Sequence, residues 1–193
     1  MPVHELGHEL GHMPVGGMAA TVPGTAAVSM SPDVPGAIMT KVETSVEVAV
    51  PVTTAYNQWT QFEEFPAFMD GVEEVRQTDE RHLHWVAEFG GTRHEWDAEI
   101  TEQQPDERVA WRNTDGKENA GVVTFHKLDD DRSRVMVQMD FVPEGVKEKL
   151  GDALGAPDRR VKGDLERFKE LIESRGSESG AWRGEVPRDD DVA

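Results

Sequence analysis

The stretch HLHWVAEFGGTRHEWDAEITE, residues 82–102, decides the fold class of this sequence. Alternate residues on each side of the Gly90-Gly91 pair are mostly apolar or aromatic. Before the pair they are Leu83, Trp85, Ala87 and Phe89, and after it they are His94, Trp96, Ala98 and Ile100. Alternation with a period of two predicts half-buried strands, and a two-glycine link predicts a tight hairpin. Residues 82–89 and 93–102 are therefore expected to pair as antiparallel strands with one aromatic face.

Five more strand-like runs lie on either side of this hairpin, over residues 41–50, 71–78, 108–113, 121–128 and 134–142. Short links containing Asp, Gly or Pro separate most of them, and links this short predict antiparallel neighbours. The same parity rule predicts the inward-facing residues on these strands: Val42, Thr44, Val46, Val48, Val50, Val109, Trp111, Asn113, Gly121, Val123, Phe125, Val135, Val137, Met139 and Phe141.

Helical patterns occur at two places. Ala55, Trp59 and Phe62 recur at helical spacing after Pro51, with Thr53 or Thr54 as the expected N-cap. Residues 63–69 predict a second short helical piece that is broken at Pro66.

The last expected element is a long C-terminal helix. Two apolar stripes, one ending at Leu154 and one beginning at Val161, predict it, with a kink at residues 155–157 and an end at Gly176. This helix is the only element long enough to cover the apolar face of the sheet. The predicted fold is α+β, a curved seven-stranded antiparallel sheet wrapped on the long helix, with two short helices after the first strand.

Composition limits the function. The chain has 193 residues, 38 acidic against 20 basic side chains, a net charge of −18 and no cysteine. Thiolate metal sites, disulfides and cysteine nucleophiles are excluded, and nucleic acid is an unfavourable partner because phosphate binding needs clustered Lys and Arg. No apolar run is long enough to span a bilayer, so stable membrane insertion is not expected.

The chain is expected to divide into three parts. Residues 1–38 are rich in Gly and Pro and contain no Lys or Arg, residues 39–176 carry the strand and helix patterns, and residues 177–193 are polar and end in an acidic run. The first and last parts are predicted to be disordered tails around one folded domain. Without the basic front end of a secretory signal, a cytoplasmic location is the expectation.

Four features together resemble a known superfamily. They are NQWTQFEEFPAFMDGVEEV (57–75), the spaced Trp85, Trp96 and Trp111, GVVTF (121–125) and DLERFKELIESRG (164–176). The sequence resembles the START-like, or SRPBCC, superfamily, and more closely its bacterial polyketide cyclase/dehydrase branch, which includes the coenzyme Q-binding type. The resemblance implies a helix-grip fold with a hydrophobic tunnel between the sheet and the C-terminal helix.

The leading functional hypothesis is binding, transport or sequestration of a hydrophobic small molecule such as a lipid, a quinone or a polyketide-like aromatic. The expected ligand-binding residues lie on the inward face of the sheet, on the short helices and on the long helix: Trp59, Phe62, Phe65, Phe68, Trp85, Phe89, Trp96, Trp111, Phe125, Met139, Phe141, Leu150, Leu154, Val161, Leu165 and Phe168. Periodicity alone also fits the alternative that these side chains pack into a solid core.

The second hypothesis is a polyketide cyclase/dehydratase of the aromatase type. That chemistry needs a positioned acid or base and a hydrogen-bond donor for a developing enolate. His94 is the candidate acid/base, and Tyr56 and Asn113 are the candidate donors, while no arginine has inward parity. A third hypothesis, a protein–protein adaptor acting through the acidic outer face, has no motif behind it.

The N-terminal part contains the metal-like pattern HELGHELGH, residues 4–12, with two overlapping HExxH matches. Gly7 and Gly11 weaken the helix that a zinc protease needs, and Pro14 stands where a third histidine would be required. No catalytic metal site and no cofactor are therefore expected.

Overall fold

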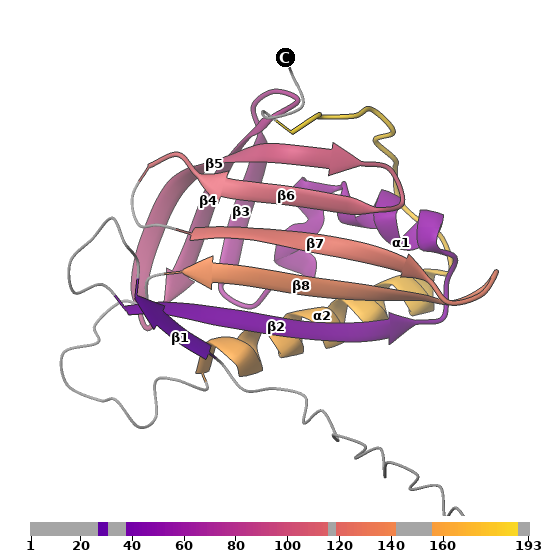
Figure 1. Ribbon diagram of the computed structural model, residues 1–193, viewed down its shortest axis with the longest axis horizontal. Helices are drawn as coiled ribbons and strands as arrows, with labels where there is room; N and C mark the ends of the chain where they lie inside the picture. The colour runs from indigo at the N-terminus through magenta and orange to yellow at the C-terminus, as the bar shows by residue number, and fades with distance from the viewer. Residues whose placement is uncertain (1–26, 31–37, 116–118, 142–155, 189–193) are drawn as a thin grey trace, which may run out of the picture.

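A computed structural model describes residues 27–30, 38–115, 119–141 and 156–188 of the chain. Eight strands form one antiparallel sheet in the order β1-β2-β8-β7-β6-β5-β4-β3 (Figure 1). They are β1 (Ala27–Met30), β2 (Ile38–Val48), β3 (Val72–Gln77), β4 (His82–Phe89), β5 (Thr92–Gln104), β6 (Arg108–Asn113), β7 (Asn119–Lys127) and β8 (Ser133–Phe141).

The seven predicted strands are present as β2 to β8, and the bounds of β4 and β6 agree with the prediction to the residue. Gly90 and Gly91 both have positive φ, as the two-glycine hairpin requires. The helix-grip architecture is confirmed: the sheet curls around α2 (Ala156–Arg175), which runs across its concave side (Figure 1). Gly176, with φ of 69°, ends this helix as predicted.

Two short helices bridge β2 and β3. Helix α1 (Val52–Trp59) has Pro51 at its N-cap position and no side-chain cap, so the predicted capping by Thr53 or Thr54 is wrong. The Thr53 hydroxyl instead donates to Asp106 Oδ2 at 3.0 Å, because the neighbouring β5–β6 turn offers a carboxylate within reach.

The second short element, η1 (Phe62–Ala67), is a 3₁₀ helix that runs through Pro66, so the predicted break at this proline does not occur. A 3₁₀ helix has three residues per turn, which aligns Phe62, Phe65 and Phe68 on one face. All three side chains are buried. The spacing of phenylalanines in this segment therefore suits the tighter helix better than an α-helix.

Parts of both tails that were expected to be disordered are ordered. Residues 27–30 form β1, which pairs with β2 at the edge of the sheet. Residues 177–188, called the C-terminal strap below, run from the end of α2 past α1 to β5, where Val186 pairs with Gln103 through two backbone hydrogen bonds of 2.8 and 2.9 Å (Figure 1). The side chain of Val186 is buried, so the strap belongs to the folded domain.

Candidate functional site

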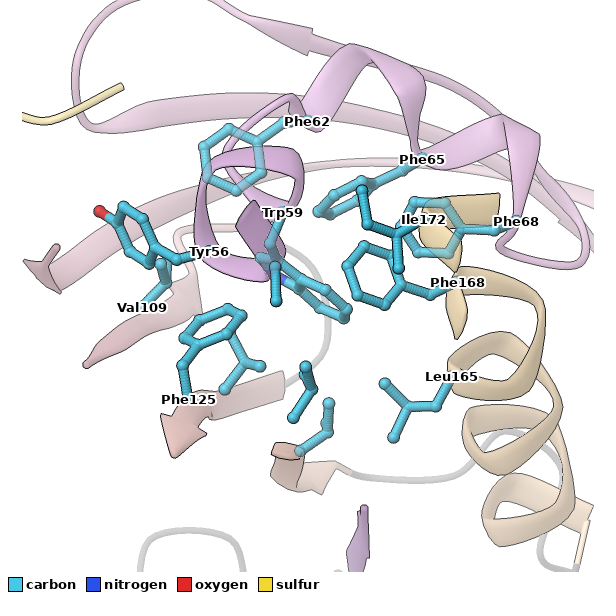
Figure 2. Packing of buried hydrophobic residues seen from close by; sticks show 14 of the residues in the cluster. Tyr56, Trp59, Phe62, Phe65, Phe68, Val109, Phe125, Leu165, Phe168 and Ile172 are labelled. Carbon is cyan, nitrogen blue, oxygen red and sulfur yellow. The ribbon is translucent and has the colours of Figure 1, made fainter. Parts of the chain in front are cut away.

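One half of the space between the sheet and α2 is filled by an aromatic cluster, which consists of Tyr56, Trp59, Phe62, Phe65, Phe68, Phe125 and Phe168 (Figure 2). Trp59 lies at its centre, with ring centroids 5.1 Å from Phe168 and 5.5 Å from Phe65, both edge to face. Leu165 and Ile172 of α2 close the cluster from the helix side. Seven of the predicted ligand-binding residues are thus buried here: Trp59, Phe62, Phe65, Phe68, Phe125, Leu165 and Phe168.

The other half of the concave side carries partly exposed aromatic residues towards the Gly90-Gly91 turn. We call this surface the tryptophan face, and its residues are Trp85, Phe89, His94, Trp96, Trp111 and Met139. Trp85 and Trp96 are direct cross-strand partners and stack with centroids 5.7 Å apart and planes only 11° apart. Because β5 extends past the end of β6 at Asn113, Trp96 has a strand neighbour on one side only among the described residues, in keeping with its partial exposure.

Trp111 is positioned by a glycine. In the register of the sheet it lies opposite Gly121, and a Cβ atom at Gly121 would lie 2.6 Å from Trp111 Cζ2. The missing side chain therefore makes the space in which this indole lies. The predicted residue Val161 of α2 is also half-buried and packs against the core, whereas the side chain of Phe141 and residues Leu150 and Leu154 lie outside the described part of the chain.

The three catalytic candidates do not converge on one point. His94 lies on the tryptophan face, where its ring stacks on Phe89 with centroids 6.1 Å apart. Asn113 lies opposite Ala98 of β5. At the usual rise per residue of a strand, Ala98 is about 13 Å along β5 from His94. Tyr56 lies farther still, because its hydroxyl accepts a hydrogen bond from Gln103 Nε2 at 3.0 Å near the far end of the same strand.

Tyr56 is also sealed inside the molecule. Its side chain is fully buried, and burial raises the pKa of its hydroxyl. The guanidinium of Arg183, on the C-terminal strap, lies 5.6 Å from the centroid of its ring and donates to both carboxylate oxygens of Asp106. In this structure the Tyr56 side chain is therefore buried beneath the strap, and its hydroxyl is hydrogen-bonded to Gln103.

The strap buries polar side chains of α1 by giving them partners. Asn57 donates to Glu178 at 2.9 Å, the Gln58 carbonyl oxygen accepts from the Ser179 backbone at 3.0 Å, and Thr60 Oγ1 accepts from the Trp182 backbone at 3.2 Å. These three polar residues, Asn57 and Gln58 of α1 and Thr60 at its C-cap, are buried. Hydrogen-bonded burial of this kind avoids the cost of an unpaired polar group.

A cleft of about 590 Å³ lies outside the sheet–helix space, between residues 60–64, the β3–β4 turn and Trp182 of the strap. Glu63, Glu64, Asp79 and Glu80 line it, so its chemistry does not suit the hydrophobic ligand that the sequence predicts. Within the described residues no group of three or more His, Asp or Glu side chains could hold a metal ion. The HExxH pattern of residues 4–12 lies outside them.

One half-buried carboxylate connects α2 to the segment between η1 and β3. Asp164 Oδ1 accepts from the Asp70 backbone at 2.9 Å and pairs with Arg167, whose Nε donates to the Phe68 carbonyl at 2.8 Å. Burial raises the pKa of Asp164 above its ordinary value despite these partners. The pair fixes the position of α2 over the sheet.

Comparison with known proteins identifies the family. A model of the family described as polyketide cyclase/dehydrase and lipid transport matches residues 48–170. The chain belongs to this family. The sequence is also similar to a protein from Streptomyces lincolnensis, an uncharacterized 17.2 kDa protein in the melC2–rnhH intergenic region. The two are 62% identical over 149 residues, which cover 77% of this chain and 99% of the relative.

Solved structures place this polyketide cyclase/dehydrase family member in the START superfamily fold. DR_A0006 from Deinococcus radiodurans is similar with a TM-score of 0.56 and 25% identity, over 70% of this chain and 98% of the other. The Zhui aromatase/cyclase from Streptomyces sp. R1128 matches with a TM-score of 0.60 and 18% identity, over 75% of this chain and 99% of the other. A START superfamily protein from Mycobacterium smegmatis matches with a TM-score of 0.55 and 16% identity, over 70% and 95%.

Several residues of this family member were missed by sequence reasoning. Gln103, Asp106 and Arg183 surround Tyr56, yet Gln103 and Asp106 follow the predicted strand and Arg183 lies in the predicted tail. Trp182 could have indicated that the C-terminal tail is ordered, because a tryptophan in an otherwise polar segment is suited to packing that segment against a folded surface. No described helix is long and apolar enough to cross a membrane.

Proposed function

We propose that this protein binds a hydrophobic small molecule that contains an aromatic ring, and that the ligand lies against the tryptophan face. The observation that carries the proposal is the contrast between the two halves of the concave side. The aromatic cluster is buried and filled by its own rings, whereas Trp85, Trp96 and Trp111 remain partly exposed. Aromatic rings gain from stacking and edge contacts with such indoles.

The resemblance to lipid-transport and cyclase proteins supports this class of ligand, and the separation of His94, Asn113 and Tyr56 favours binding over catalysis by these three residues. A carrier needs an apolar surface of suitable shape and no converging acid and base. Lipids, quinones and polyketide-like aromatics all have the required apolar surface.

The test uses phenylnaphthylamine, a neutral aromatic dye whose fluorescence rises when it leaves water. Trp96→Ala is expected to weaken its binding about tenfold, because the dye loses a stacking partner. Trp182→Ala is the matched control, since Trp182 lies on the strap and outside the tryptophan face. Equal affinity of the Trp96→Ala variant and the unaltered protein would overturn the proposal.

The second candidate function is cyclisation or dehydration of a polyketide-type substrate. His94 supports it, because an imidazole on the tryptophan face lies where a bound ring system would be. Turnover of a poly-β-keto mimic that disappears in His94→Gln, while binding of the dye persists, would establish this function. Unchanged turnover by the His94→Gln variant would exclude His94 as the catalytic acid or base.

A further inference from the structure

Three neighbouring cations at the start of α2 form no ion pair with any carboxylate of the described residues. Lys and Arg residues elsewhere in the described chain lie almost without exception beside a carboxylate, as Arg134 does with Glu47 and Arg112 with Glu99. None of the ion pairs between described residues involves Arg159, Arg160 or Lys162. In a protein with a net charge of −18, three neighbouring positive charges that form no ion pair with the described carboxylates are unusual.

Arg160 connects this group of cations to the tryptophan face. Its guanidinium carbon lies 4.4 Å above the centroid of the Phe89 ring, and the other partner of that ring is His94. A guanidinium that rests on an aromatic ring keeps its N–H donors directed to the sides, where they can bind an anion. Arg160 is exposed, so these donors are accessible.

The described acidic residues near Arg160 form no ion pair with it. Asp164, one turn farther along α2, is already bound by Arg167 and by the Asp70 backbone. Asp158 lies on the same turn and forms no ion pair with it among the described residues. Glu88 belongs to the outer parity of β4, whereas Phe89 and the guanidinium lie on the concave side.

We propose that the ligand is amphipathic: its ring system lies against the tryptophan face, and a carboxylate or comparable anionic group binds beside Arg160. Arg159 and Lys162 add positive potential at the same end of the helix. The inference rests on the proposed function, because it specifies the ligand of that same site. A free acid is therefore the expected ligand class, in preference to an alcohol, an ester or a hydrocarbon of the same size.

The experiment compares two dyes that share one ring system. Anilinonaphthalene sulfonate carries an anionic group, and phenylnaphthylamine lacks it. Arg160→Gln is expected to weaken binding of the sulfonate about fivefold, the size of one solvent-accessible charge pair, and to leave the neutral dye unchanged. Raising NaCl from about 0.05 M to about 0.5 M is expected to reduce the difference in sulfonate affinity between the unaltered protein and the Arg160→Gln variant, because salt screens the attraction to Arg160.

Arg93→Gln is the matched control, because it makes the same change of charge at a residue that pairs with Glu73 and Glu95 and has outer parity. It should affect neither dye. If both dyes bind equally and Arg160→Gln changes neither affinity, the inference about the anionic group is overturned while the proposed function stands. If neither dye binds to the unaltered protein, the proposed function is overturned and this inference with it.

Discussion

Gly121 shows how a single missing side chain shapes the tryptophan face. A methyl group at this position would lie 2.6 Å from Trp111 and 2.8 Å from the Gln138 carbonyl oxygen, so the indole has to move. Gly121→Ala is expected to lower the free energy of unfolding by about 1–3 kcal/mol, the usual cost of overpacking, and to weaken binding of phenylnaphthylamine. Urea denaturation and dye titration measure the two effects.

Gly163 provides the matched control. It lies inside α2, and the nearest atom to an added methyl group is Arg167 Nη1 at 3.3 Å, so a shift of that guanidinium by a few tenths of an ångström makes room for the methyl group. Gly163→Ala is expected to stabilise the protein by about 0.5–1 kcal/mol, because alanine favours the helix. Equal effects of the two substitutions would contradict the role assigned to Gly121.

The second prediction at this scale concerns Tyr56. Its hydroxyl is the acceptor for the buried amide of Gln103, so Tyr56→Phe leaves that amide without a partner. We expect a loss of about 1–3 kcal/mol in the free energy of unfolding and no loss of dye binding. Unaltered stability together with lost binding would show instead that Tyr56 contacts the ligand.

Sequence parity predicted the direction of most side chains but could not predict their exposure. Trp59 and Trp96 both have inward positions, yet one is buried at the centre of the aromatic cluster and the other is partly exposed. Exposure depends on which strand ends first and on what covers the face. A pattern within a single strand contains neither piece of information.

At the scale of elements, the C-terminal strap is the part that sequence reasoning placed wrongly. Strands β4 and β6 could be bounded to the residue because turn residues mark their ends locally. The strap has no periodicity, and it is ordered by partners such as Asn57, Asp106 and Gln103, which lie far away in the sequence. Order of this kind is a tertiary property.

Removal of the strap is the third prediction. A chain that ends at Gly176 loses the burial of Val186 and the hydrogen bonds to α1, and its free energy of unfolding should fall by about 2 kcal/mol, roughly the value of one buried valine. A chain that ends at Arg188 keeps the strap and is the control. Equal urea midpoints for the two chains would show that the strap adds no stability.

The contribution of the strap should also depend on pH. The hydrogen bonds from Arg183 hold the pKa of Asp106 below its ordinary value, and the hydrogen bond from Asn57 does the same for Glu178. Carboxyls with a lowered folded-state pKa stabilise the folded state fully above their unfolded pKa, near about 4, and this stabilisation is lost as the pH falls through the lowered values.

The difference in unfolding free energy between the chains ending at Arg188 and Gly176 is therefore expected to be constant from about pH 6 down to about pH 5 and to shrink below about pH 4. Urea denaturation at a series of pH values measures it. A difference that grows in acid would contradict the roles of Asp106 and Glu178.

At the scale of the whole molecule, charge is the dominant feature. The net charge of −18 makes the folded chain repel itself, and screening by salt should relieve this repulsion. We expect the melting temperature to rise when NaCl is raised from about 0.05 M to about 0.5 M. A fall would mean that the many surface ion pairs outweigh the repulsion between like charges.

The fold of the whole molecule could be predicted because alternating strands and one long amphipathic helix allow few arrangements. The candidate site could be predicted only as a set of inward residues. Its division into a filled half and a partly exposed half follows from the large rings of η1 and α1, which occupy the space beside the second half of α2. Volumes of side chains brought together from distant segments decide that division.

The late position of the strap also matters while the chain is being made. Its partners on α1 precede it by more than a hundred residues, for example in the pairing of Asn57 with Glu178. Domains generally begin to fold from the N-terminal side during synthesis, and distant contacts form slowly. The polar side of α1 is therefore expected to stay in contact with water until the strap has been synthesised and can pack against it.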